Sequence, residues 1–247
     1  MSGHSKWSTI KRKKGAADAK RGVIFTRISK DITLAAREGG ENPDMNPGLR
    51  LAIKNAKAAN MPSANIDRAI NKGIGNIPGI KYENFIYEGY GPGGTAIMME
   101  VMTDNKNRTV PDIRHIMTKN GGNLGEQGCV NWMFDKKGTI TIQKEEGIED
   151  ALLEKSLDLG ADDIKIEKDY FIIITSSNNF DKVINGLEQE GYAVNGEVGL
   201  IPNNMVQVSS NEIKQLLGLL EKLEEHEDVQ KVYSNFDYDE TEMETLL

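Results

Sequence analysis

The chain has 247 residues, of which 38% are hydrophobic and 28% are charged, and it contains one cysteine, Cys129. These values are typical of a globular protein with two or three domains, and a single cysteine excludes an internal disulfide. No stretch approaches the roughly 18 apolar residues of a membrane helix, and the start lacks the apolar core of a signal peptide. We therefore expect a cytoplasmic protein with no membrane partner.

The formal net charge of −8 is divided unevenly along the chain. Residues 1–81 carry 16 Lys and Arg against 6 Asp and Glu, whereas residues 82–247 carry 14 against 32. A basic head of this kind attracts a polyanion such as nucleic acid, and the acidic body repels it. The alternative is that the head and the body attract each other.

The first 15 residues are basic and contain few apolar residues, which predicts a flexible arm. Trp7 would either stack on a base or anchor the arm on the next domain. The candidate nucleic-acid contacts of the arm and the residues that follow it are Lys6, Trp7, Lys11, Arg12, Lys13, Lys14, Lys20 and Arg21.

Apolar residues at helical spacing predict three helices within residues 16–73. The first ends at Gly39-Gly40, the second begins at Asn46-Pro47, and the third follows Pro62-Ser63. The side of the second helix opposite its apolar stripe carries three further candidates, Arg50, Lys54 and Lys57. These side chains suit phosphates better than bases, and the connection over residues 39–46 is longer than the turn of a helix-turn-helix. We therefore expect little sequence preference on duplex DNA.

After a linker at residues 73–80, alternating apolar residues predict strands mixed with helices. The first predicted group is a strand over 95–103, a helix that opens at a Thr109–Asp112 capping box, and a strand over 129–134. The middle group has strands over 139–143, 164–167, 170–175 and 197–201, with helices over 148–159 and 180–190. The last group is a strand over 205–208, a helix over 211–225 and a strand over 229–236.

This order predicts an α+β multidomain protein, with an N-terminal helical domain followed by two ferredoxin-like α+β domains, the second inserted in the first. The predicted domains are residues 1–79, residues 80–136 plus 204–247, and the inserted residues 137–203. The alternative is two α+β domains in series, because a sequence does not reveal which strands pair.

Reactive groups do not converge in the sequence. His4, His115 and His226 lack the spacing of metal ligands, so we expect neither a metal nor another cofactor. Cys129 lies in an apolar stretch, which favours an inert thiol over a nucleophile paired with His115. We therefore expect no enzymatic activity and no small-molecule substrate.

Two basic residues beside a predicted helix N-terminus, Lys106 and Arg108, form a candidate anion site. The free N–H groups of such a terminus point at a phosphate, and the positive side chains add to the attraction. The alternative is an ordinary polar cap without a ligand.

Several distinctive motifs are spread over nearly the whole chain. They include Gly3-His4-Ser5-Lys6-Trp7, the run from Tyr87 to Gly94, Asn107-Arg108-Thr109, the run from Gly121 to Gly125, and Trp132-Met133-Phe134. Together they closely resemble the YebC/PmpR family. Ser63-Ala64 and Asn71 depart from the family pattern and remove a little positive charge.

The resemblance implies three domains around a cleft and a non-enzymatic DNA-binding regulator of transcription. Other members of the family act in translation, which implies ribosomal RNA and the ribosome as alternative partners. A third hypothesis is a protein adaptor whose acidic body contacts a basic protein.

Overall fold

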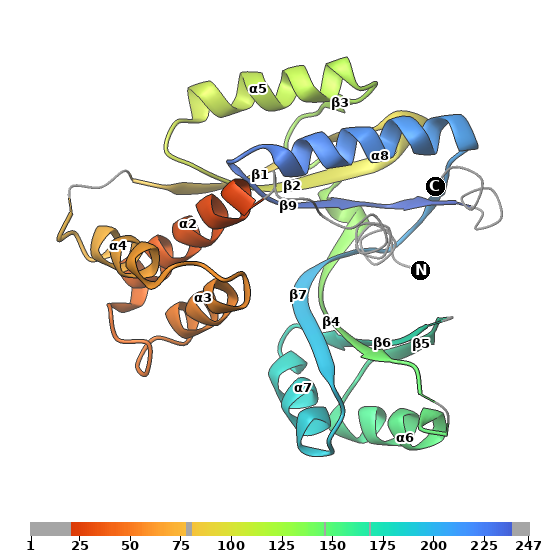
Figure 1. The fold of residues 1–247 in the computed structure, drawn as a ribbon. Helices are drawn as coiled ribbons and strands as arrows, with labels where there is room; N and C mark the ends of the chain where they lie inside the picture. Colours follow the sequence, from red (N-terminus) through yellow and green to blue (C-terminus); the bar gives the residue numbers. More distant parts are fainter. Residues whose placement is uncertain (1–20, 78–80, 146, 168, 239–247) are drawn as a thin grey trace.

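The computed structural model describes residues 21–77, 81–145, 147–167 and 169–238 of the chain. Within these residues it has a unit of three helices and two four-stranded antiparallel sheets, each covered by two helices (Figure 1). The predicted α+β multidomain class is therefore confirmed. No helix in the described ranges is long and apolar enough to cross a membrane.

The helical unit consists of α2 (Arg21–Gly39), α3 (Pro47–Ala58) and α4 (Ser63–Gly73). The Asn46 side chain caps α3, because its Oδ1 accepts a hydrogen bond from the backbone N–H of Leu49 at 3.0 Å. Gly73 lets α4 approach α2 closely, since a Cβ there would lie 2.5 Å from the carbonyl oxygen of Thr33. The predicted helix boundaries at Asn46-Pro47 and Pro62-Ser63 are thus confirmed.

The first sheet contains β1 (Glu83–Tyr90), β2 (Ala96–Thr103), β3 (Asn123–Leu124) and β9 (Val229–Ser234), in the order β3-β1-β2-β9. Its upper face in Figure 1 is covered by α5 (Lys106–Lys119) and α8 (Ser210–Glu225). Between these layers lies the largest apolar core, which includes Ile97, Met99, Ile113 and Leu216.

The second sheet is built from one continuous stretch of chain. Its elements are β4 (Phe134–Gln143), α6 (Glu149–Leu159), β5 (Asp163–Ile166), β6 (Tyr170–Ser176), α7 (Phe180–Gln189) and β7 (Val194–Pro202). The strand order β5-β6-β4-β7 is that of a ferredoxin-like sheet. The two ends of the stretch are neighbours, because Phe134 pairs with Pro202. The strands of the first sheet come from the sequence before this stretch and from the sequence after it, as an insertion requires. The predicted domain boundaries themselves stay a prediction.

The helical unit and the second-sheet unit both attach to the face of the first sheet that α5 and α8 leave uncovered (Figure 1). Near the second-sheet unit, Ala96, Met98 and Tyr233 of this face pack against Val130 and Phe134. A short parallel pair, β8 (Val206–Gln207) with β10 (Phe236–Asp237), and the 3-10 turns η2 (Pro92–Gly94) and η3 (Asn131–Met133) complete the described elements.

Two strands of the first sheet, β1 and β3, were not predicted. The strand predicted over 129–134 is wrong for residues 129–133, which form a bend and η3, and only Phe134 belongs to a strand, as the first residue of β4. The cause is the buried Glu88 carboxylate, which accepts hydrogen bonds from the backbone N–H groups of Gly128, Val130 and Asn131 at 2.7–2.8 Å. These N–H groups are therefore not available to a strand partner.

Two further predictions fail at their boundaries. The helix expected to open at Thr109 begins three residues earlier, with Asn105 as its cap, and Thr109 is buried with its hydroxyl on Asp228. The strand expected over 229–236 is interrupted at Asn235, whose Oδ1 accepts a hydrogen bond from the N–H of Ala96 at 2.7 Å.

Candidate nucleic-acid interface

The exposed side of α3 carries the predicted basic row. Arg50, Lys54 and Lys57 are exposed, while Leu49, Ala52 and Ala56 on the opposite side are buried. Residues four and three positions apart lie on one side of a helix, so the three side chains project from the same strip. Among the described residues, no carboxylate lies within 4.0 Å of the ammonium groups of Lys54 and Lys57.

Arg50 differs from the two lysines in its contacts. Its Nη1 donates hydrogen bonds to the carbonyl oxygens of Pro43 at 3.2 Å and Asp44 at 3.3 Å, in the connection between α2 and α3. These hydrogen bonds hold the guanidinium against the preceding loop, which favours a phosphate contact over bidentate hydrogen bonding to a guanine base.

Most of the predicted arm contacts lie outside the described residues. Arg21 is the first residue of α2. The predicted residues outside the described ranges are Lys6, Trp7, Lys11, Arg12, Lys13, Lys14 and Lys20.

The predicted anion site at the start of α5 contains carboxylates. Arg108 Nη2 lies 3.0 Å from Oδ1 of Asp104 and 3.0 Å from Oδ2 of Asp228, and its pKa is raised by these partners. The Lys106 ammonium lies 4.9 Å from the centre of the Phe85 ring. The Arg108 charge is thus neutralised by its neighbours, so at this position the polar-cap alternative describes the geometry better than a phosphate site.

A buried ion pair joins the helical unit to the first sheet. The ammonium of Lys30 on α2 donates to Asp228 Oδ1 at 2.6 Å, to the carbonyl oxygen of Glu227 at 2.9 Å and to that of Met102 at 3.0 Å. Asp228 Oδ2 accepts from Arg108 and Thr109. Burial opposes ionisation of Asp228, but these hydrogen bonds outweigh it and lower its pKa to about 2. Both charges therefore persist at neutral pH and fix α2 on the sheet.

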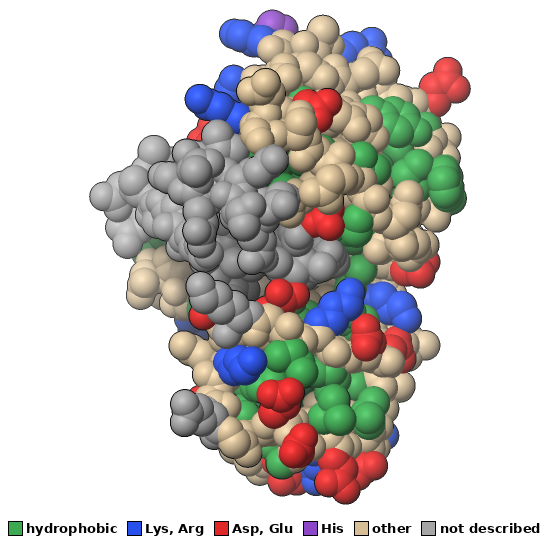
Figure 2. Space-filling view, turned by 90° about the vertical axis from the view of Figure 1, so that its right-hand side faces the viewer, with side chains coloured by type: hydrophobic (Ala, Val, Ile, Leu, Met, Phe, Trp, Pro, Cys, Tyr) green, Lys and Arg blue, Asp and Glu red, His purple; other side chains and the backbone are tan. Residues whose placement is uncertain are grey.

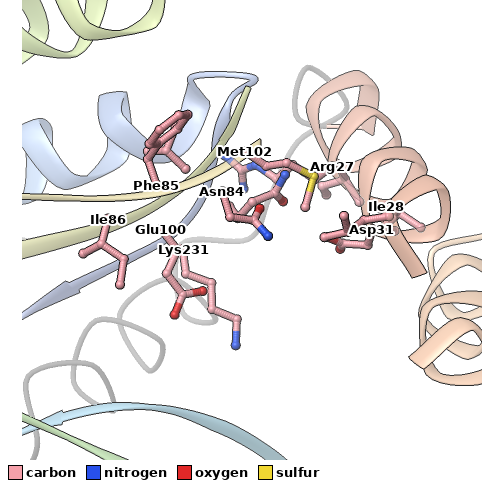
Figure 3. A pocket seen from close by; sticks show the side chains of 13 residues that line it. Arg27, Ile28, Asp31, Asn84, Phe85, Ile86, Glu100, Met102 and Lys231 are labelled. Atoms are coloured by element: carbon pink, nitrogen blue, oxygen red, sulfur yellow. The ribbon is translucent and has the colours of Figure 1, made fainter. Parts of the chain in front are cut away.

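A cavity of about 690 Å³ lies beside this ion pair, between α2 and the strands β1, β2 and β9. Figure 3 shows Arg27 and Asp31 projecting from α2, with Glu100 and Lys231 on the strands opposite. Burial raises the pKa of Asp31 to about 6, although Lys231 and Arg27 favour its charged form. Lys231 is bonded to Glu197 of β7 at 2.6 Å, so the cavity wall also contacts the second-sheet unit.

The described residues include the candidates for reactive chemistry His115, His226 and Cys129. No group of three or more His, Cys, Asp or Glu among them is placed to hold a metal ion. Cys129 is half-buried, and burial together with Glu88 raises the pKa of its thiol, which disfavours the nucleophilic thiolate. His115 is exposed on α5 and lines a surface hollow with Lys119 and Lys222.

The second-sheet unit carries much of the acidic charge. Residues 134–202 contain 7 Lys and 15 Asp and Glu. Figure 2 shows carboxylates spread over this unit, in the lower half of the view. This unit therefore offers a phosphate backbone little attraction, and the exposed row on α3 is the stronger candidate.

The sequence did not reveal one exposed aromatic pair. Trp132, expected within a strand, lies in η3 with 67% of its surface exposed, and Tyr90 at the end of β1 is 36% exposed. The indole N–H and the Tyr90 hydroxyl both donate to the carbonyl oxygen of Cys129. The closely spaced glycines between residues 121 and 128 were the signal in the sequence for this exposed loop, because they predict a tight loop rather than a strand.

Two family models match this chain, one over the helical unit and one over the part with the two sheets. A family model described as the TACO1/YebC N-terminal domain matches residues 5–76, and one described as the TACO1/YebC second and third domain matches residues 82–236. A probable transcriptional regulatory protein of Desulfotalea psychrophila is 55% identical, over 100% of this chain and 99% of its own. One of Dictyoglomus thermophilum is 54% identical, over 100% of both chains.

A solved structure supports the fold. The crystal structure of a conserved hypothetical protein from Aquifex aeolicus superposes with a TM-score of 0.79 at 43% identity and covers 90% of this chain and 93% of that one. The resemblance seen in the sequence motifs is thereby confirmed over both α+β parts and the helical part.

Proposed function

Because this chain belongs to the TACO1/YebC family, we propose that it is a non-enzymatic, nucleic-acid-binding regulator of gene expression that acts in the cytoplasm. The names of its relatives, probable transcriptional regulatory proteins, support a regulatory role. The observation that carries nucleic-acid binding is the exposed basic row of Arg50, Lys54 and Lys57 on α3, in the part of the chain with the largest positive charge.

The contacts of this row favour binding to the sugar-phosphate backbone. Lysine ammonium groups are point charges that suit phosphates, and the Arg50 guanidinium is already bonded to its own loop. Backbone contacts position a nucleic acid without reading its sequence. This observation favours a second candidate function, a ribosome-associated translation factor that binds ribosomal RNA, since structured RNA is recognised by shape and backbone.

Competition binding at one near-physiological salt concentration tests both candidates. A labelled promoter fragment bound to the protein is challenged with scrambled duplex DNA and with ribosomal RNA. We expect scrambled DNA to compete almost as well as promoter DNA, and ribosomal RNA at least as well. A preference for the promoter of more than about a thousandfold would contradict backbone recognition and favour a specific transcription factor.

The salt dependence of binding tests the basic row itself. Each neutralised phosphate contributes about 0.9 to the log-log salt slope, so Lys54→Ala/Lys57→Ala should lower the slope by up to about 2. Replacing Lys11, Arg12, Lys13 and Lys14 together should lower it by about 2 to 4. The matched control is Lys119→Ala/Lys214→Ala, which removes two exposed lysines from α5 and α8. Equal slopes for the α3 variant and this control would place the contact elsewhere.

Nuclease treatment of the complex isolated from cells separates these functions from a protein adaptor. A regulator held by nucleic acid is released when the nucleic acid is digested. Retention on a basic protein partner after complete digestion would favour the adaptor and contradict the proposal.

A further inference from the structure

The loop between β3 and β4 presents Trp132 to solvent on a rigid support. Glu88, only 4% exposed, accepts three backbone hydrogen bonds from this loop, and the Gly125 N–H donates to the Glu88 carbonyl oxygen at 2.8 Å. Val130 and Phe134, on either side of Trp132, are buried against the first sheet. The loop is therefore anchored at both ends, and η3 turns the indole outward between the anchors.

The polar atoms of Trp132 and Tyr90 already take part in hydrogen bonds, so their ring surfaces are what remains for binding. The indole N–H, the one polar atom of the Trp132 side chain, donates to the Cys129 carbonyl oxygen at 3.2 Å, and the Tyr90 hydroxyl donates to the same oxygen at 3.0 Å. What remains exposed on Trp132 is apolar ring surface. Tryptophan and tyrosine held in this way are typical of binding contacts, because a large rigid ring binds with a small loss of conformational entropy.

The exposed polar side chains of the loop match the edges of a base better than a phosphate. Gln127 and Asn131 in the same loop are exposed and carry amides that both donate and accept hydrogen bonds. The charged residues nearest to Trp132 in the sequence are Glu126, Asp135 and Lys136, which together do not attract a phosphate backbone. Stacking on an aromatic ring needs no such attraction, since every base has a flat π face.

We propose that Trp132 is a stacking site for an unpaired base of a single-stranded nucleic acid whose backbone is held by the basic helical unit. This inference rests on the proposed function. The loop packs on the sheet face that α5 and α8 leave uncovered, and the helical unit attaches to this same face (Figure 1). A single-stranded nucleic acid can therefore approach Trp132 and the helical unit from the same side of the sheet.

Intrinsic fluorescence tests the stacking directly, because the chain has two tryptophans. The variant Trp7→Phe leaves Trp132 as the single emitter. We expect 12-nucleotide poly(U) RNA to quench its emission with the same midpoint as the binding curve from anisotropy of the end-labelled RNA. A 12-base-pair duplex, whose bases are already stacked, should bind without this quenching.

Affinity measurements on full-length variants complete the test. Trp132→Ala should weaken binding of the poly(U) RNA between about 5-fold and about 150-fold, because stacking on one base contributes about 1 to 3 kcal/mol. Trp132→Phe should retain most of the affinity, and Leu157→Ala, which trims a 51% exposed leucine on α6, should leave it unchanged.

The outcomes separate this inference from the proposed function. Binding of the RNA without quenching, or with equal affinity for wild type and Trp132→Ala, overturns the stacking site while nucleic-acid binding stands. Absence of RNA and DNA binding to the wild-type chain overturns both. Loss of capture of a basic protein by Trp132→Ala, with RNA binding unchanged, would assign the ring to a protein partner instead.

Discussion

Removal of the Lys30 charge should loosen the helical unit from the first sheet. In Lys30→Met, a side chain of similar length replaces a lysine whose three ammonium hydrogens all have acceptors, and Asp228, with a side chain 1% exposed, loses one of its partners. Breaking a buried pair in this way typically costs about 3 to 5 kcal/mol. Asp228 keeps Arg108 and Thr109, so we expect a loss near the lower value, about 3 kcal/mol.

The pH dependence follows from the pKa of Asp228. The folded pKa of about 2 lies below the usual aspartate pKa of 3.8, so the carboxylate stabilises the fold above about pH 4, and the gain is lost as the pH falls toward 2. The difference of nearly two pKa units corresponds to roughly 2 kcal/mol at neutral pH. Asp228→Asn should therefore lower stability at pH 7 by at least this amount and flatten the acid limb of the stability curve.

Hydrogen exchange of α2 and urea unfolding between pH 3 and pH 7 measure these changes. A loss of 3 kcal/mol corresponds to exchange in α2 about 150-fold faster. The double variant Lys30→Met/Asp228→Asn leaves neither charge buried alone, so it should be more stable than the sum of the two single losses predicts. Strictly additive losses would refute the reasoning, because they would mean that the two side chains act independently.

Two further variants probe the first sheet and the second-sheet unit. Glu88→Gln should destabilise the protein by roughly 1.5 to 3 kcal/mol in urea unfolding and increase acrylamide quenching of Trp132, because an amide cannot accept all three backbone hydrogen bonds. The control is Glu126→Gln at an exposed neighbouring position, and equal behaviour of the two variants would contradict the role of Glu88. Replacing residues 137–199 by Asn-Gly joins Lys136 to its strand partner Leu200 through a two-residue turn, so the remainder should unfold cooperatively by circular dichroism, and loss of the transition would argue against an inserted domain.

Local signals in the sequence predicted the helical unit well. Asn46-Pro47 carries both a capping side chain and a proline suited to the first turn, and these determine the start of α3 whatever packs around it. The exposed side of α3 followed from the same periodicity, because the apolar stripe leaves Arg50, Lys54 and Lys57 on the opposite side. Short-range physics was sufficient here.

The errors arise where a distant residue decides the local structure. Residues 129–134 have the apolar character of a strand, but Glu88, some 40 positions earlier, binds the N–H groups that a strand would use. Thr109 has the pattern of a helix cap, but its hydroxyl donates to Asp228, 119 positions later. Arg108, a candidate for an anion site, likewise has a partner that the local sequence does not show, Asp228, 120 positions later.

The charge division explains how a chain of net charge −8 can still bind a polyanion. At physiological ionic strength the Debye length is about 8 Å, so a phosphate on α3 interacts mainly with charges in its immediate surroundings and much less with the distant acidic surface. The local charges include Arg50, Lys54 and Lys57, while 15 of the 32 acidic residues of the body belong to the second-sheet unit. Because Lys30 and Asp228 hold the helical unit on the first sheet, the basic row on α3 keeps its position relative to that sheet. The acidic unit therefore affects the orientation in which a nucleic acid arrives more than the strength of its final contacts.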